Sequence, residues 1–343
     1  MSLRSEIAEQ PRVIARLLEA GWPEARTLAR PLGAAEHLTI AARGSSDNAA
    51  TYGKYLFESL AGLVTALAAP SLITRYRTPP NFVRGAVIGI SQSGAAPDVA
   101  AVLAEARAAR APTVAITNRA NSLLARTAAE TFLLRAGPER SIAATKTYTA
   151  TCVALALLAA NAAESRGRSA LSLAGLVDSV TEAEASERDA DRLARKIGRA
   201  RSIVVLGRGY EYATALEAAL KIKELVQVWA EPYSSADFAH GPISLLEAGV
   251  PVLLFGARGA AQRESRALCG TLRAKGATIY AVTNDQKLAE LADDAVWLRA
   301  PLSEALTPIS FAVVAQLVAL SLASRRGRDV ERPRGLSKVT RTR

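Results

Sequence analysis

The sequence predicts an α/β fold built from two parallel sheets with helices on both faces. Its 343 residues, half of them hydrophobic, are enough for two domains of ordinary size. Strand-length apolar segments alternate with helix-length ones, and they are rich in Val, Ile and Leu without strict alternation, which is typical of strands covered on both faces. The predicted strands are residues 37–42, 86–91, 113–117, 131–135, 202–207, 251–256, 278–283 and 295–298.

An internal repeat supports the division into two lobes. Residues 39–55 resemble residues 204–220, and residues 87–96 resemble residues 252–261, both at an offset of 165. A third match, near residue 113, falls in nearly the same register. We therefore predict two copies of one lobe, with the following parts: an N-terminal helical arm 1–31, a first lobe 32–165, a helical connector 166–200, a second lobe 201–325 and a C-terminal tail 326–343.

Composition narrows the classes of partner. The formal net charge is +11, but residues 325–343 hold +6 of it, and only 5% of residues are aromatic. We therefore expect an anionic small molecule rather than nucleic acid. The longest unbroken apolar run, residues 152–160, is too short to span a membrane. Two cysteines predict a reducing, cytoplasmic setting, and two histidines without a Cys cluster predict no metal site.

A serine-rich loop follows the second predicted strand of the first lobe. It comprises Ser91, Gln92, Ser93, Gly94 and, after Ala95, Ala96. Pro97 then suits the first turn of a helix, so the loop should wrap a helix N-terminus, which favours a phosphate. The second lobe has Gly-Ala-Arg-Gly at the same place, so only one copy carries this feature. The alternative is an ordinary capped turn.

A second polar loop follows the first predicted strand. Gly44, Ser45 and Ser46 begin a helix there, and neighbouring loops of this kind open onto one crevice in doubly wound sheets. Ser46 is expected to cap its helix, to donate to a phosphate, or to do both. A Walker loop and a complete G-x-G-x-x-G are both absent, which disfavours a dinucleotide.

The second lobe carries candidates for proton transfer. Glu217, Lys221 and Glu224 share one helix face, for which a solvated stripe of ion pairs is the more common explanation. His240 precedes Gly241 and Pro242, so it should lie on a rigid loop, where a histidine can transfer protons near neutral pH. The other histidine, His37, sits at a strand start and is expected to be structural.

The basic tail contains Lys338. A disordered end is the usual interpretation of such a segment. Leu336 and Val339 can instead anchor the tail and place Lys338 in a pocket, where desolvation favours the neutral amine. A neutral amine can attack a carbonyl and form a Schiff base.

In combination, these motifs resemble the sugar isomerase (SIS) domain family, most of all the isomerase half of glutamine–fructose-6-phosphate aminotransferases. The resemblance covers nearly the whole chain, and its motifs are specific only together. They are R-G-S-S at 43–46, S-Q-S-G at 91–94, A-A-T-K-T-Y-T at 143–149, A-L-x-x-A-L-K-I-K-E at 215–224, A-H-G-P at 239–242 and P-R-G-L-S-K-V-T at 333–340. The fold implied is two flavodoxin-like lobes in a homodimer.

The resemblance implies a role for each motif. The sugar phosphate would be bound by Ser46 and the 91–93 loop, with Ala144 and Thr145 nearby. Glu224 would move the proton between C1 and C2, and Lys221 would assist with hydroxyl protons. His240 would open the sugar ring from the neighbouring subunit, and Lys338 would form an imine with the ketose. No metal or organic cofactor is implied.

Several departures from the aminotransferase pattern shift the expected reaction. Ala95-Ala96 replaces Glu-Thr, Ala144 replaces Ser, and residue 2 is Ser rather than a nucleophilic Cys. The tail is more similar to stand-alone SIS-type glucosamine-6-phosphate deaminases. We therefore predict conversion of glucosamine 6-phosphate and water to fructose 6-phosphate and ammonia. Galactosamine 6-phosphate or a phosphorylated fructosamine is the alternative substrate, and a non-catalytic sugar-phosphate sensor is the alternative class.

Overall fold

The computed structural model describes residues 2–169 and 171–338. By its internal contacts the chain divides into two compact units. The β1 unit contains Arg12–Glu139, Lys146–Ser172 and the tail from Ser337. The β6 unit contains the residues up to Pro11, the short segment Arg140–Thr145, and Leu173–Leu336. These units do not follow the five predicted parts residue by residue, and the predicted boundaries stay a prediction.

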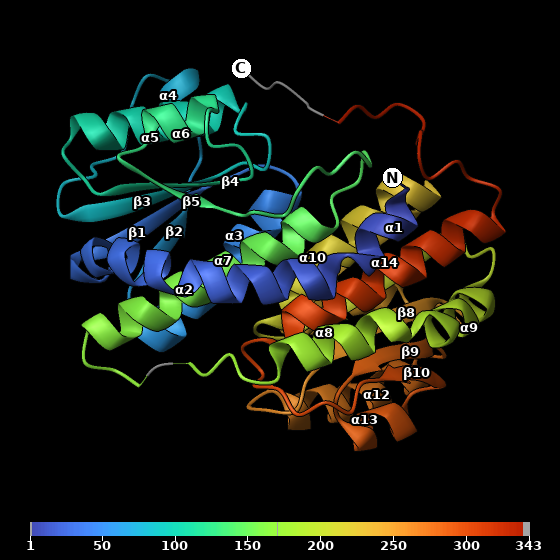
Figure 1. Cartoon of the computed structure of the whole chain (residues 1–343). Coiled ribbons are helices and arrows are strands. Elements are labelled where there is room, and N and C mark those ends of the chain that lie inside the picture. Colours follow the sequence, from blue (N-terminus) through green and yellow to red (C-terminus); the bar gives the residue numbers. More distant parts are fainter. Residues whose placement is uncertain (1, 170, 339–343) are drawn as a thin grey trace. The chain divides into compact units, whose positions relative to one another are not determined.

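The β1 unit is a parallel sheet covered by helices on both faces (Figure 1). From edge to edge its strands are β2 (Thr65–Leu67), β1 (His37–Ala41), β3 (Gly85–Ile90), β4 (Thr113–Thr117) and β5 (Glu130–Leu133). One face carries α2 (Gln10–Ala34), α3 (Ser45–Leu56) and α7 (Lys146–Ser165), and the other carries α4 (Ser71–Thr74), α5 (Pro97–Ala108) and α6 (Leu123–Thr127). Val87, Val99, Leu103 and Leu124 form part of the core on the α5 side.

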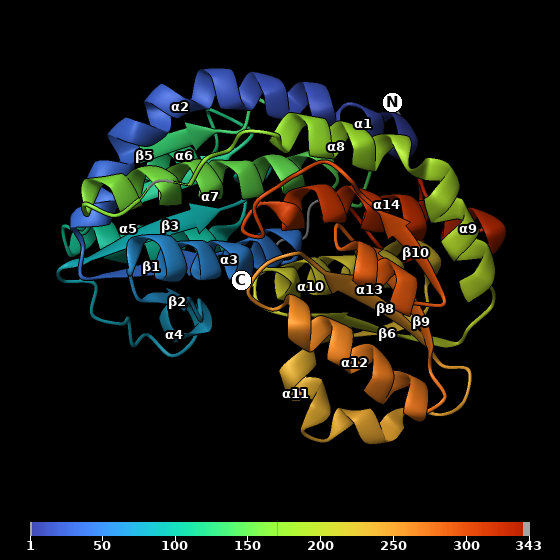
Figure 2. The ribbon, with the colours of Figure 1, turned by 90° about the horizontal axis from the view of Figure 1, so that it is seen from below.

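The β6 unit repeats this architecture (Figure 2). Its strands run β7 (Trp229–Ser234), β6 (Ser202–Gly207), β8 (Pro251–Gly256), β9 (Thr278–Thr283) and β10 (Asp294–Trp297), again all parallel. The helices α8 (Leu176–Ala185), α9 (Glu187–Ile197), α10 (Glu211–Lys221) and α14 (Thr307–Arg325) pack together, and α1 (Leu3–Ala8) contacts α14. Across the sheet lie α11 (Ser235–Ala239), α12 (Gln262–Ala274) and α13 (Gln286–Leu291).

The identical strand order of the two sheets confirms the predicted fold of two tandem α/β lobes. All eight predicted strands are present. Four have the predicted bounds, and the ends of the others differ by one residue or, for β5, by up to two. The sequence analysis missed β2 and β7, which lie at one edge of each sheet, and found β5 and β10 at the other edge. β2 has three residues, and β7 contains Pro232, which an edge strand tolerates because one side of its backbone needs no partner.

A π-helical turn ends the first helix of each copy. These turns are η1 (Phe57–Ala61) after α3 and η2 (Ile222–Val226) after α10, separated by the repeat offset. Each closes on a left-handed residue, Gly62 at φ 61° and Gln227 at φ 58°. The π-turn is therefore a feature of the repeated lobe, although only η2 carries a predicted catalytic residue, Glu224.

One helix within the described residues, α14, is long and apolar enough to cross a membrane by length and composition. In the structure 83% of its apolar window is buried. It packs against α8, α9 and α10, which is the environment of a core helix. No unbroken apolar run of membrane-spanning length marks α14 in the sequence, because Gln316 interrupts its apolar residues.

Candidate active site

The serine loop of the β1 unit is a tight turn between β3 and α5. Gly94 has φ +62°, and a Cβ there would lie 2.1 Å from Ser122 Oγ, so only glycine fits. The Gly94 amide donates to Ser91 O at 3.0 Å, and the Ala95 amide donates to Ser93 Oγ at 3.3 Å. As predicted, α5 begins at Pro97. The loop thus wraps the N-terminus of α5, where a helix favours an anion.

An ion pair connects this loop region to the neighbouring one. Arg43, at the end of β1, places Nε 2.7 Å from Oδ2 of Asp98 in the first turn of α5, and Asp98 is only 2% exposed. Because Arg43 neutralises Asp98, the helix N-terminus remains suitable for a ligand anion. Burial raises the pKa of nearby Asp47, and Arg43 partly offsets that rise. The sequence analysis did not identify this pair, because the two residues are 55 positions apart.

The second polar loop begins α3. Gly44 is the N-cap at φ 58° and supplies no side-chain cap, so Ser45 and Ser46 lie in the first turn of the helix. Ser46 therefore does not cap α3 and is partly exposed. Of its two expected roles, donation to a phosphate is the one that this geometry leaves open.

Two pockets flank the serine loop within the β1 unit. One, of about 510 Å³, is lined by Ser93, Gly94 and Ser122 among others, and the other, of about 500 Å³, by Gln92 and Glu139 among others. Arg119, directly after β4, lines both. A guanidinium beside a serine loop suits a phosphate. The one signal in the sequence for Arg119 is its place just after a predicted strand.

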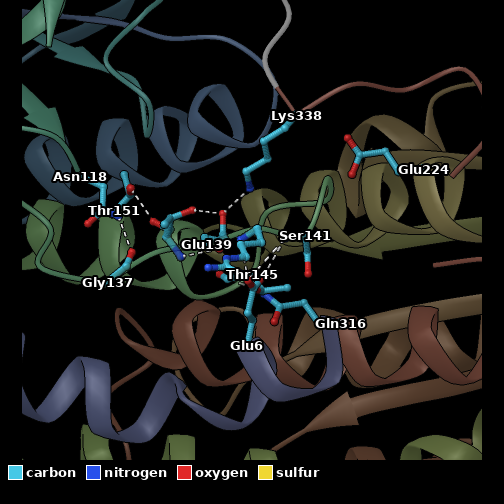
Figure 3. A network of polar contacts seen from close by, with 12 residues as sticks. Glu6, Asn118, Gly137, Glu139, Ser141, Thr145, Thr151, Glu224, Gln316 and Lys338 are labelled. Atoms are coloured by element: carbon cyan, nitrogen blue, oxygen red, sulfur yellow. Dashed lines mark hydrogen bonds and ion pairs between the residues drawn. The ribbon is translucent and has the colours of Figure 1, made fainter. Parts of the chain in front are cut away.

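The tail places Lys338 on a buried carboxylate of the same unit. Lys338 Nζ lies 2.9 Å from Glu139 Oε2, and the side chain of Glu139 is fully buried (Figure 3). Glu139 also accepts from the amide of Thr147 at 3.1 Å and from its hydroxyl at 2.7 Å. The sequence analysis expected Lys338 in a pocket that favours the neutral amine. The structure instead pairs Lys338 with Glu139, a partner that the sequence analysis did not identify. Expected anchor Leu336 is 42% exposed, and Val339 lies outside the described residues.

In the β6 unit, Lys221 lies between two carboxylates. Its Nζ is 2.5 Å from Glu224 Oε2 and 3.4 Å from Glu217 Oε1. Lys221 and Glu217 are each 1% exposed, so the interpretation as a solvated stripe is wrong. Glu224, on the π-turn η2, is 23% exposed. A buried ammonium therefore fixes a carboxylate that remains accessible, as proton transfer to a ligand requires.

The remaining predicted residues of the β6 unit lie in two other places. His240 is the C-cap of α11 and is exposed. Ala144 and Thr145 lie in the 140–145 segment, where Glu6 Oε1 accepts from the Arg140 amide at 2.6 Å (Figure 3). Gln316 Nε2 donates to Thr145 O at 3.5 Å. Buried polar contacts therefore hold this loop in place.

Within each unit the structure groups the predicted residues as follows. Gly44, Ser45, Ser46, Ser91, Gln92, Ser93, Gly94, Ala96 and Lys338 belong to the β1 unit, and Ala144, Thr145, Lys221, Glu224 and His240 to the β6 unit. The β1 group carries hydroxyls, loop amides and cations, which bind anions. The β6 group carries groups that exchange protons. Side chains suited to anion binding and side chains suited to proton transfer thus belong to different units.

Two copies of a doubly wound sheet, with polar loops after parallel strands, define the class as a tandem α/β protein. Within that class, a family model described as SIS domain matches residues 32–161 and residues 196–325. The chain therefore belongs to the SIS domain family.

Proteins similar to this chain include aminotransferases and enzymes named for phosphorylated sugars. Glutamine–fructose-6-phosphate aminotransferase of Gloeobacter violaceus is 38% identical over 97% of this chain, which spans 57% of that relative's length. Among solved structures, a candidate phosphosugar isomerase from Silicibacter pomeroyi is 37% identical, with a TM-score of 0.84 over 96% of this chain and 99% of that one. Glucosamine-6-phosphate deaminase of Thermotoga maritima has a TM-score of 0.81 over 99% of this chain and all of the other. At 22% identity it shares the fold.

Proposed function

We propose that this protein isomerises a phosphorylated amino sugar, converting glucosamine 6-phosphate and water to fructose 6-phosphate and ammonia. The observation that carries the proposal is the contact of buried Lys221 with the accessible Glu224. A carboxylate held in one orientation can take a proton from one carbon of a sugar and return it to the next. The similarity of this chain to aminotransferases and to a candidate phosphosugar isomerase supports a sugar phosphate as its ligand.

The other residues take roles that their surroundings support. The phosphate is assigned to Ser46, Ser91 and Ser93, with Arg119 supplying positive charge. Lys338 is assigned to the imine with the ketose. As an ammonium paired with Glu139, it must lose a proton before it can attack a carbonyl. His240 is assigned to ring opening, contributed by the second subunit of a cytoplasmic homodimer.

Product formation tests the proposal. Purified protein is incubated with glucosamine 6-phosphate, in parallel with galactosamine 6-phosphate, without glutamine, and fructose 6-phosphate and ammonia are measured. We expect both products in equal amounts from the glucosamine ester. Binding measured by calorimetry without turnover of either ester would contradict the proposal and favour a sensor or a fructosamine substrate.

Glu224→Gln tests the assignment of the base. The amide keeps the size of the side chain but cannot accept a proton, so turnover should fall by about 100-fold or more. Sugar-phosphate affinity should stay near that of the wild type. Glu247→Gln, an exposed change in the same unit, is the matched control and should keep full turnover. Wild-type turnover in Glu224→Gln would show that another group is the base.

A further inference from the structure

A second, strongly basic pocket lies in the β6 unit, away from Lys221 and Glu224 in the chain. It has a volume of about 730 Å³, within the usual range for small-molecule sites. The end of β10, the loops after β8, β9 and β10, and the helices α12 and α13 form it, so it lies at the carboxyl edge of the sheet, where doubly wound folds bind ligands. Its charged lining residues are Arg258, Arg266, Lys287 and Arg299, with Asp285 and Glu290.

One of the four cations, Arg266, forms an ion pair with a carboxylate. Arg266 makes a two-pronged contact with Asp285, at 2.6 and 2.7 Å. Within residues 2–169 and 171–338, Arg258, Lys287 and Arg299 have no side-chain ion pair to an acid. The lining therefore holds an excess of positive charge, with two guanidinium groups available to a ligand.

Hydrogen bonds fix the backbone at both of these arginines. The Arg258 amide donates to Asn284 Oδ1 at 2.7 Å, and the Arg299 amide donates to Glu182 Oε1 at 2.7 Å. The Arg299 guanidinium also lies over the Trp297 ring, 4.8 Å from its centroid. Stacking on Trp297 thus preorganises the Arg299 guanidinium, which loses less entropy on binding. A guanidinium can match the oxygens of a phosphate two at a time.

The loop amides at the start of α12 are already occupied. Glu304 Oε2 accepts from the Ala260 amide at 2.7 Å, and Glu304 Oε1 from the Ala261 amide at 3.4 Å. By the repeat, this loop corresponds to the serine loop of the first lobe. A carboxylate of the chain itself thus takes the anion position on the loop, which leaves the arginines as the groups that could receive a ligand anion in this pocket.

We propose that the pocket of Arg258 and Arg299 binds a second phosphorylated small molecule carrying at least two negative charges. The proposal goes beyond the proposed function and does not depend on it. The pocket is a concave site of small-molecule size rather than an extended basic stripe, which favours a phosphate ester or diphosphate over a nucleic acid strand. None of the residues assigned to catalysis lines it.

Fluorine NMR of the full chain tests this site with inorganic pyrophosphate as the probe. The chain has three tryptophans, and among them Trp297 alone lines the pocket. In protein labelled with 5-fluorotryptophan, pyrophosphate at constant ionic strength should shift the Trp297 resonance to saturation. The resonances of Trp22 and Trp229 should not move. Trp297→Phe assigns the signal.

Variants then locate the bound ion. Arg258→Ala/Arg299→Ala should weaken pyrophosphate binding by about tenfold or more, because two charge-assisted contacts are lost. Arg263→Ala, an exposed change on α12, is the matched control and should bind as the wild type does. Ser91→Ala/Ser93→Ala should leave the Trp297 response intact, which separates this site from the candidate active site.

Three results would overturn the inference. They are an absence of any saturable Trp297 shift, an equal response to potassium chloride alone, and undiminished binding in Arg258→Ala/Arg299→Ala. An equal response to citrate would overturn the assignment to a phosphate-bearing ligand.

Discussion

Lys221 illustrates how burial changes the meaning of a charged motif. Three charges on one helix face are usually solvated, but here Lys221 and Glu217 are removed from water while Glu224 stays accessible. Burying such charges is costly unless each has a partner, so the ion pairs are needed to keep the cluster ionised. The sequence supplies the spacing, whereas the burial follows from packing against α14, which the spacing does not reveal.

The buried carboxyl group of Glu211 should make the stability of the protein depend on pH. Glu211 is buried, bonded to the hydroxyls of Thr214 and Thr307, and burial raises its pKa from 4.5 to about 8. The Thr307 hydroxyl also contacts Glu304 O, but it has only one proton to donate. Both contacts are satisfied when Glu211 is protonated, because Glu211 then donates to the Thr307 hydroxyl while Thr307 donates to Glu304 O.

The raised pKa means that the folded state holds a proton that the unfolded state has released between pH 4.5 and about 8. Stability from this group is therefore present at low pH and is lost as pH rises through this window. Glu211→Gln should remove this loss, so its melting temperature relative to the wild type should rise from pH 5 to pH 8 and then level off. Thermal unfolding at several pH values checks this, and parallel pH profiles would contradict it.

At the scale of elements, the serine loop depends on Gly94. Alanine there would combine a left-handed backbone with a clash against Ser122. Gly167, at φ +71° with open space around it, is the matched control, since alanine there meets the backbone strain alone. We expect Gly167→Ala to cost about 1 kcal/mol, and Gly94→Ala to cost more and weaken sugar-phosphate binding. Denaturant unfolding and calorimetry measure both effects. Equal costs for the two variants would show that the clash has little effect.

Element prediction from this sequence succeeded where a strand carries several apolar residues. Eight of the ten strands are rich in apolar residues, and each was found, including the edge strands β5 and β10. β2 was missed because the three residues Thr65–Leu67 carry too little pattern, and β7 because Glu231 and Pro232 interrupt its apolar residues. Pro97 predicted the start of α5 because its fixed φ suits a helix N-terminus.

At the scale of the whole chain, duplication followed by divergence explains the distribution of polar residues. At the repeat offset, Ser46 corresponds to Glu211 and Ser93 corresponds to Arg258. One copy therefore presents hydroxyls at its loops, whereas the other buries a carboxyl group and exposes a guanidinium. The matching strand order shows that the fold tolerates both sets of loops.

The candidate site was only partly predictable for a related reason. Serines, Glu224 and Lys338 stood out by motif, and the family resemblance gave them roles. The ion-pair partners in the site could not be predicted, because they are far apart in sequence: Arg43 pairs with Asp98, and Glu139 pairs with Lys338. Such pairings depend on the strand order, which sequence patterns leave open.

The most direct test of the account follows the hydrogen at C2 of the sugar. Glucosamine 6-phosphate deuterated at C2 is given to the wild type and to Glu224→Gln, and the position of the deuterium is read by NMR. We predict that the wild type removes deuterium from C2, to C1 of the product or to solvent, while Glu224→Gln binds the ester and leaves C2 intact. Deuterium retained at C2 by a wild type that binds the ester, or removed equally well by Glu224→Gln, would contradict the account.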